Sequence, residues 1–181
     1  STFHGTYNFR SSLKKFYNSI MLRMDGTIAI SNFIRDHIEK NYVLKKGSIK
    51  TIERGIDLNF FHPKVISDYD ISNAIKNYGL KDGTIKILLP ARVTEWKGHF
   101  ILVEAISKLL HKKDLSIEVL FIGPDQNVSL KKKIENFIKV KNLEHVIKFY
   151  GSTNKMNLIF SLSDIVISSS TDPEAFGRVS I

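Results

Sequence analysis

Residues 85–98 read IKILLPARVTEWKG, and this stretch indicates the fold. Residues 85–90 are almost all apolar, which is typical of a strand that is buried on both faces of a parallel sheet. A polar loop follows, and the apolar residues from Gly98 to about His111 have the spacing of an amphipathic helix. A buried strand, a loop and a helix in this order predict an α/β unit, in which ligands bind beyond the carboxyl ends of the strands.

The same alternation of strands and helices continues on both sides of this stretch. We expect strands at 85–90, 116–122, 146–150 and 165–168, and helices at 67–78, 98–111, 128–141 and 154–162. Strands that each lead towards a helix predict a Rossmann-like domain with a parallel sheet. Upstream, short strands at 27–30 and 48–52 flank a helix that Ser31 caps and that runs to about Lys40. The composition changes near Pro63, so we predict two domains, at 1–64 and 65–181.

The overall composition limits the classes of protein to consider. The chain has 181 residues, of which 43% are hydrophobic and 25% charged, so it can build a core and is not a disordered chain. No apolar run approaches the ~20 residues of a membrane-spanning helix. The absence of cysteine excludes a disulfide scaffold, a zinc–thiolate site and a thiol nucleophile. The net charge of +9 favours a polyanionic ligand, such as nucleotide phosphates, an anionic membrane or nucleic acid.

The loop that follows the strand at 85–90 carries two cations. Arg92 comes directly after the strand, and Lys97 comes just before the predicted helix. Both side chains and the amides of a helix N-terminus would face one point, which suits a diphosphate. The alternative is that both cations are solvated on a loop. By the same topology, the loops that begin at Gly123 and Gly151 would line the ligand pocket.

A second polar loop, residues 169–177, leaves the last predicted strand and enters a helix. Glu174 can accept hydrogen bonds from sugar hydroxyls, and the amides of Phe176 and Gly177 can donate to phosphate or sugar oxygens. An acidic first turn of a helix explains the same residues without any ligand.

Two other patterns have structural explanations beside the functional ones. His4 follows an expected strand end, where a histidine can donate a hydrogen bond to a substrate, move a proton, or serve only as a structural partner. Asp68 and Asp70 match a short metal-binding pattern of some sugar-transferring enzymes. We reject a metal there, because Ser67 with Asp70 predicts a helix cap and both acids favour a helix N-terminus.

The segment from Phe9 to Met24 predicts a basic amphipathic helix. Its apolar face consists of Phe9, Leu13, Phe16, Tyr17, Ile20 and Met24. Basic residues, among them Lys14 and Lys15, lie elsewhere on the helix. We favour a helix that faces the core with a solvated back, and the alternative is docking on anionic lipid head groups.

Taken together, these loops resemble the retaining GT-B glycosyltransferases of family 4, also called group 1. The matching stretches are Phe3-His4-Gly5, Ile28-Ala29-Ile30-Ser31, Arg54-Gly55-Ile56-Asp57 with Phe61-His62-Pro63, Ala91-Arg92 with Trp96-Lys97-Gly98, Phe121-Ile122-Gly123, Phe149-Tyr150-Gly151, and Pro173-Glu174-Ala175-Phe176-Gly177. They follow the family's order, and the Arg-x4-Lys-Gly loop followed by Pro-Glu-x-Phe-Gly is the most specific pair. The sequence around Glu174 is also similar to bacterial lipopolysaccharide-core glycosyltransferases.

The resemblance implies a GT-B fold of two Rossmann-like domains, with a nucleotide-sugar bound by the second. It implies that Arg92 and Lys97 hold the donor diphosphate, that Glu174 contacts the donor sugar, and that His4 closes on the sugar near the reacting carbon. Backbone contacts would come from Phe176 and Gly177. The implied reaction transfers a hexosyl unit with retention of configuration, by a front-face mechanism, and needs no metal or other cofactor.

The resemblance also implies the partners: a nucleotide-sugar donor and a glycan or lipid-linked acceptor. The location would be cytoplasmic or at the inner face of the cytoplasmic membrane. Nucleic acid is not expected, because no basic stripe is interleaved with aromatic residues. The family's second glutamate would fall just past Ile181, so we expect the chain to be a fragment that is inactive alone. The alternative function is a non-catalytic remnant with a weak phosphate site.

Overall fold

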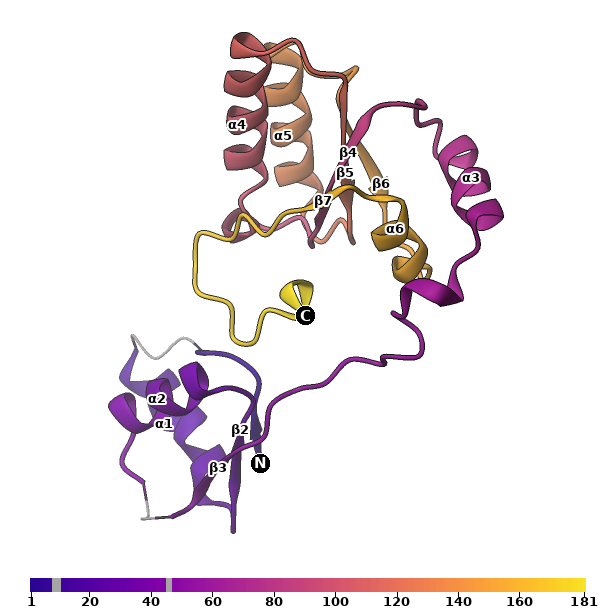
Figure 1. Cartoon of the computed structure of the whole chain (residues 1–181). Helices are drawn as coiled ribbons and strands as arrows, with labels where there is room; N and C mark the ends of the chain where they lie inside the picture. Colours follow the sequence, from indigo (N-terminus) through magenta and orange to yellow (C-terminus); the bar gives the residue numbers. More distant parts are fainter. Residues whose placement is uncertain (8–10, 45–46) are drawn as a thin grey trace. The chain divides into compact units, whose positions relative to one another are not determined.

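The structure is a computed structural model of the chain, and it describes residues 1–7, 11–44 and 47–181 (Figure 1). These residues form two compact units. Unit 1 comprises Ser1–Ile56, Pro173–Val179 and Ile181, and unit 2 comprises Asp57–Asp172 and Ser180. These units are groups of residues that contact one another, and they are not the same as the two predicted domains. The division into domains at 1–64 and 65–181 stays a prediction.

Unit 1 is built on a three-stranded parallel sheet in the order β1-β2-β3. The strands are β1 (Thr2–Phe3), β2 (Thr27–Ala29) and β3 (Ile49–Thr51). The helices are α1 (Ser12–Ser19), the 3-10 helix η1 (Ile20–Arg23) and α2 (Asn32–Asn41). The core of the unit consists of Phe3, Ala29, Ile30, Ile34, Ile38 and Tyr42. The strands predicted at 27–30 and 48–52 are confirmed, each slightly shorter than expected.

The first turn of α2 confirms the predicted cap. The hydroxyl of Ser31 accepts a hydrogen bond from the Ile34 amide at 3.2 Å, which satisfies one of the free amides of the helix end. Ile34 and Ile38 are one turn apart, and both are fully buried against the sheet. A polar cap followed by this apolar spacing explains why the helix begins where it does.

The amphipathic segment does not pack as we expected. Phe9 and Arg10 lie outside the described residues, and α1 contains no buried residue. Leu13 and Tyr17 are 79% and 74% exposed, so the predicted core-facing helix is wrong for α1. The next turn, η1, supplies the packing instead, because its Met21 and Leu22 contact the core of unit 1. The apolar face of α1 is therefore uncovered by the described residues.

Unit 2 contains a four-stranded parallel sheet in the order β6-β5-β4-β7. The strands are β4 (Ile85–Pro90), β5 (Ile117–Ile122), β6 (Ile147–Gly151) and β7 (Ile165–Val166). All the strands predicted for this part are confirmed, although β7 is shorter than the expected 165–168. Among the described strands β7 lies at the edge of the sheet, where Ile165 and Val166 pair with Ile87 and Leu88 of β4. The amide of Ile167, just after β7, donates to the carbonyl of Leu88 at 2.8 Å.

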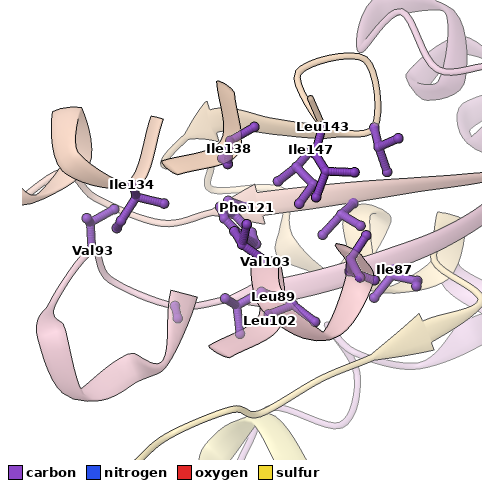
Figure 2. Close-up of a cluster of buried hydrophobic side chains, with 14 of the residues drawn as sticks. Ile87, Leu89, Val93, Leu102, Val103, Phe121, Ile134, Ile138, Leu143 and Ile147 are labelled. Carbon is purple, nitrogen blue, oxygen red and sulfur yellow. The ribbon is translucent and has the colours of Figure 1, made fainter. Parts of the chain in front are cut away.

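Helices cover both faces of this sheet (Figure 1). They are α3 (Asp68–Asn77), α4 (His99–Lys112), α5 (Val128–Val140) and α6 (Met156–Leu162). The chain also has the 3-10 helices η2 (Pro63–Val65), η3 (Glu95–Lys97) and η4 (Arg178–Ser180), of which η4 lies mostly in the segment that returns to unit 1. Side chains alternate along a strand, so Ile87 and Leu89 of β4 pack with α4 and α5, whereas Leu88 packs with α3 and α6. Figure 2 shows the first of these two clusters.

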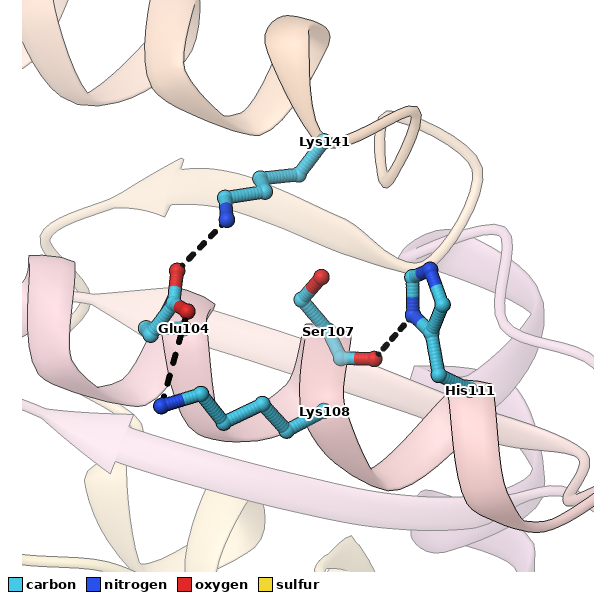
Figure 3. A network of polar contacts seen from close by, with 5 residues as sticks. All are labelled: Glu104, Ser107, Lys108, His111 and Lys141. Atoms are coloured by element: carbon cyan, nitrogen blue, oxygen red, sulfur yellow. Dashed lines mark hydrogen bonds and ion pairs between the residues drawn. The ribbon is translucent and has the colours of Figure 1, made fainter.

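A polar network ties α4 to the end of α5 (Figure 3). The carboxylate of Glu104 accepts from Lys141 Nζ at 2.7 Å and pairs with Lys108 Nζ at 3.6 Å. The hydrogen bond from Lys141 is the main cause that lowers the pKa of Glu104 below its ordinary value. Within the described part of the chain, no helix is both long enough and apolar enough to cross a bilayer.

Candidate functional site

The carboxyl ends of β4, β5 and β6 meet at one edge of the sheet, because all three strands are parallel. Their loops are joined there by backbone hydrogen bonds. The amide of Gly123, after β5, donates to the carbonyl of Gly151, at the end of β6, at 2.8 Å. The amide of Val93, after β4, donates to the carbonyl of Pro124 at 3.1 Å. The edge is therefore one connected surface built from three loops.

Gly123 is required by the close approach of two segments of the chain, the loop after β5 and the residue that follows β4. A Cβ placed on it would lie 2.1 Å from the carbonyl oxygen of Ala91, a distance that atoms do not adopt. Gly151 is in the left-handed region, with φ 70°, where a glycine is favoured. The structure thus brings both predicted pocket glycines to this edge, and each has a backbone reason for being there.

Arg92 is exposed on this edge, two residues after the end of β4. Its Nη1 donates to Oε1 of Gln126, in the loop after β5, at 3.4 Å. The neighbouring Asp125 is held by Lys131 Nζ at 2.7 Å. The guanidinium therefore lies beside the Gly123 loop and remains open to a ligand.

Lys97 ends η3, and Gly98 caps α4. The ammonium of Lys97 lies 4.2 Å from the ring centroid of Trp96, a cation–π contact. Gly98 has φ 73°, which turns the chain sharply into the first turn of α4. Because the first amides of a helix have no intrahelical acceptors, this end of α4 carries a partial positive charge. Arg92, Lys97 and the N-terminus of α4 thus belong to a single loop of cationic character.

The turn around Lys97 is anchored by residues that we did not predict. Ser169 and Thr171 lie beyond the carboxyl end of β7 and bind the carbonyls of residues 96–98. The sequence offers only a run of hydroxyl residues there. Their partner becomes evident only from the strand order, which places β7 next to β4.

His99 is a second residue that sequence reasoning missed. It is the first residue of α4 and only 2% exposed, and neither ring nitrogen has a hydrogen-bond partner among the described residues. Its ring stacks on Phe149 at 6.2 Å and meets Phe121 edge-on at 5.0 Å. Burial, and then the charge of Lys97, lower the pKa of His99 from 6.5 to about 4. It is therefore a neutral aromatic group under the cationic loop.

The remaining predicted site residues belong to unit 1. His4 is exposed and directly follows β1, as expected. Glu174 is partly exposed, and Gly177 is in the left-handed region with φ 77°. Phe176 packs against the core of unit 1, so its ring has a structural role beside any backbone contact. The candidate residues are thus divided, with Arg92, Lys97, Gly123 and Gly151 in unit 2.

The loop that carries Glu174 is fixed to α2 within unit 1. The hydroxyl of Ser31 donates to the carbonyl of Ala175 at 2.5 Å, while the same oxygen caps α2. One serine therefore connects a helix N-terminus with the residue that follows Glu174. This contact joins residues 144 positions apart and could not be anticipated from the sequence.

The rejected metal-binding pattern is confirmed as a helix cap. Ser67 accepts from the amide of Asp70 at 3.1 Å and donates to its carboxylate at 2.6 Å, at the start of α3. In the described ranges, no three histidine or acidic side chains come together as metal ligands could. That the reaction needs no metal stays a prediction.

Comparisons with known families identify the chain. The family model described as glycosyl transferases group 1 matches residues 70–181, and the one described as glycosyltransferase family 4 matches residues 1–60. This chain belongs to the group 1 glycosyltransferases. The cationic loop of unit 2 lies within the group 1 match, and β1 with His4 lies within the family 4 match.

Solved structures agree with this family and with a GT-B fold. The glycosyltransferase chain is 36% identical to a glycosyltransferase from Rickettsia africae, with a TM-score of 0.85 over 98% of this chain and 46% of that one. It resembles Anabaena HepE in complex with UDP and glucose, at 22% identity and a TM-score of 0.86, over 98% of this chain and 48% of HepE. WaaG, a glycosyltransferase of lipopolysaccharide biosynthesis, matches at 12% identity with a TM-score of 0.75, over 92% of this chain and 45% of WaaG.

The glycosyltransferase chain spans about half the length of these solved structures. No curated protein matches it. The predicted glycosyltransferase family and α/β fold are confirmed, whereas retention of configuration and a lipopolysaccharide acceptor stay predictions.

Proposed function

We propose that the protein transfers a hexosyl unit from a nucleotide-sugar to a cell-surface glycan or lipopolysaccharide-core acceptor, with retention of configuration. The observation that carries the proposal is the loop between β4 and α4, which holds Arg92, Lys97 and a helix N-terminus at the carboxyl edge of the sheet. Membership of the group 1 glycosyltransferases supports the class of reaction. The HepE complexes with UDP and glucose and with UDP-glucose support a uridine nucleotide as the first donor to test.

In the proposed reaction the loop acts on the leaving group. When the bond from the sugar to the diphosphate breaks, negative charge grows on the phosphate oxygens. Arg92, Lys97 and the amides of α4 are in place before the reaction, so they stabilise this charge without reorganising. Two cations and a helix N-terminus can do this without a divalent ion, and we propose a metal-independent reaction with no other cofactor.

The donor sugar would be held by residues of unit 1. Glu174 would accept hydrogen bonds from the sugar hydroxyls, and the amides of Phe176 and Gly177 would contribute backbone contacts. His4 would approach the sugar near the reacting carbon, where its exposed imidazole can donate a hydrogen bond. Because no side chain has been identified as a covalent nucleophile, we propose that the acceptor attacks from the face that the nucleotide leaves.

We further propose that the enzyme works in the cytoplasm, on or near the inner face of the cytoplasmic membrane. The support for the membrane contact is α1, whose exposed apolar side chains include Leu13, Phe16 and Tyr17. Lys14 and Lys15 lie on the same short helix, and basic residues of this kind favour anionic lipid head groups.

The test is a screen of UDP- and GDP-sugars with the full-length protein, followed by substitution of the two cations. We expect Arg92→Ala and Lys97→Ala each to lower kcat/KM for the donor by about 10²- to 10³-fold, which is typical of the loss of one preorganised electrostatic contact. Lys132→Ala is the matched control, because Lys132 is an exposed lysine on α5. It should retain wild-type turnover.

Two results would contradict this proposal. If Arg92→Ala and Lys97→Ala both kept the wild-type kcat/KM for the donor, the proposed roles of Arg92 and Lys97 would be wrong. A full-length protein that binds UDP but turns over none of the sugars would favour the non-catalytic alternative.

A further inference from the structure

We propose that Ser169 is a positioning residue for Lys97, assisted by Thr171. Both hold the turn at residues 96–98 in the conformation that presents the ammonium of Lys97 to the donor diphosphate. This inference rests on the proposed function, because it assigns Ser169 an effect on phosphate binding that is exerted through Lys97.

Four hydrogen bonds carry the proposal. The hydroxyl of Ser169 donates to the carbonyl of Lys97 at 3.0 Å and lies 3.2 Å from the carbonyl of Gly98. The amide of Thr171 donates to the carbonyl of Trp96 at 2.7 Å, and its hydroxyl donates to the same oxygen at 3.2 Å. Three consecutive carbonyls of the turn are therefore bound by one short segment beyond β7.

The fit between the two segments leaves no room for a side chain on Gly98. A Cβ on Gly98 would lie 1.8 Å from the carbonyl oxygen of Ser169 and 3.0 Å from its Cβ. The contact is between backbones, so neither segment can yield by rotating a side chain. Gly98 is also left-handed at φ 73°, which fixes the angle at which α4 begins.

These contacts act on Lys97 through its own peptide groups. The peptide plane between Lys97 and Gly98 is held by the hydroxyl of Ser169, and the one between Trp96 and Lys97 by Thr171. Lys97 also lies over the ring of Trp96, at 4.2 Å. Since both flanking peptide groups are fixed, the starting direction of the lysine side chain is fixed as well. A preorganised cation loses less entropy when it binds a phosphate.

A purely structural role for Ser169 makes a different prediction, and a double-mutant cycle separates the two. If Ser169 acts through Lys97, the effect of Ser169→Ala on phosphate affinity must disappear once Lys97 has been replaced. If Ser169 only stabilises the fold, its effect on affinity will be absent or will be the same in both backgrounds.

The experiment measures the affinity of the full-length protein for UDP and for inorganic diphosphate by titration calorimetry. The variants are Ser169→Ala, Lys97→Ala and the double variant. Ser168→Ala is the control, because Ser168 is exposed and makes no hydrogen bond that the described structure shows. We expect Ser169→Ala to raise the Kd of both ligands by roughly 3- to 10-fold, the effect of one hydrogen bond. Ser168→Ala should leave both Kd values unchanged.

The outcomes are distinct. Loss of the Ser169 effect in the Lys97→Ala background supports the positioning role, as does recovery of affinity in Ser169→Thr, which restores a hydroxyl. An unchanged Kd in Ser169→Ala, or an equal effect in both backgrounds, overturns it while leaving the proposed function intact. A wild-type Kd in Lys97→Ala overturns both. Should Ser169→Ala fail to fold, Thr171→Val takes its place in the cycle, because it removes one hydroxyl and retains the 2.7 Å backbone bond.

Discussion

His99 shows how a single residue can connect the proposed phosphate site with the core. It is buried between Phe121 and Phe149 at the start of α4, where a charged imidazole would be almost fully removed from solvent and would have no acceptor among the described residues. Its neutral form therefore belongs to the folded state. The neighbouring Lys97 supports this, since a second positive charge beside it would be repelled. The cationic loop proposed to bind the ligand is therefore next to an uncharged aromatic cluster of His99, Phe121 and Phe149.

This burial predicts a specific dependence of stability on pH. In the unfolded chain the pKa of His99 is 6.5, so the imidazole takes up a proton below that pH, whereas in the folded chain it stays neutral down to about pH 4. Acidification between these values stabilises the unfolded state, so the free energy of unfolding falls as the pH falls from 6.5 to 4. The loss reaches on the order of 3 kcal/mol at the lower end.

The measurement is the free energy of unfolding by denaturant at several pH values between 4 and 7, for the wild type and His99→Phe. Phenylalanine keeps the aromatic contacts and cannot take up a proton. The variant should lose less stability on acidification, and at pH 7 it should be about as stable as the wild type, because two unpaired buried nitrogens are removed. If both proteins showed the same pH dependence, the lowered pKa would be wrong.

At the scale of elements, helix caps determine where α2 and α3 begin. Both helices use a serine whose hydroxyl accepts an amide three residues later, at 3.2 Å for Ser31 and 3.1 Å for Ser67. The two caps differ in their second contact. Ser31 also donates to the carbonyl of Ala175, in the loop that carries Glu174, whereas Ser67 donates only to Asp70 within its own first turn. The cap of α2 therefore binds both its own helix and the loop that carries Glu174, whereas the cap of α3 binds only its own helix.

This difference predicts unequal costs for the same substitution. Ser67→Ala should lower the free energy of unfolding by about 1 kcal/mol, which is typical of a lost cap. Ser31→Ala should cost about 2 kcal/mol, because a carbonyl of a distant segment loses its donor as well. Chemical denaturation of both variants checks the order, with circular dichroism to follow the helices. Equal losses would show that the bond to Ala175 contributes nothing to stability.

At the scale of the whole molecule, the chain passes through unit 2 and returns to unit 1 with residues 173–179. Each unit has its own core, and their parallel sheets are separate. The unit that carries His4 and Glu174 also carries α1, whose apolar residues remain uncovered by the described chain. The surface proposed for membrane contact and the residues proposed for the donor sugar are thus on one unit.

The proposed membrane contact predicts binding of the full-length protein to lipid vesicles. The wild-type protein should sediment together with vesicles of zwitterionic lipid that contain about one third anionic phosphatidylglycerol, because α1 offers both apolar and basic side chains. Replacing Leu13 and Phe16 together with aspartate should abolish most of this binding. Leu58→Asp is the control, since Leu58 is 71% exposed but lies in unit 2. Equal sedimentation of the wild type and the α1 variant would contradict the membrane contact.

The sequence by itself determined the α/β fold, the strands of unit 2, the helix caps at Ser31 and Ser67, and the family. The fold, the strands and the caps depend on periodicity and on contacts within one turn, and the family depends on the resemblance of the loop motifs. A sequence displays both directly. Only the tertiary structure decided that Ser169 and Thr171 bind the Lys97 turn, that His99 is buried without a hydrogen-bond partner among the described residues, and that no residue of α1 is buried by the described part of the chain. Each of these findings depends on which strands become neighbours in the sheet and on which elements pack against a given helix face. The periodicity of apolar residues identifies the apolar face of a helix or strand. It does not show whether another part of the chain packs against that face.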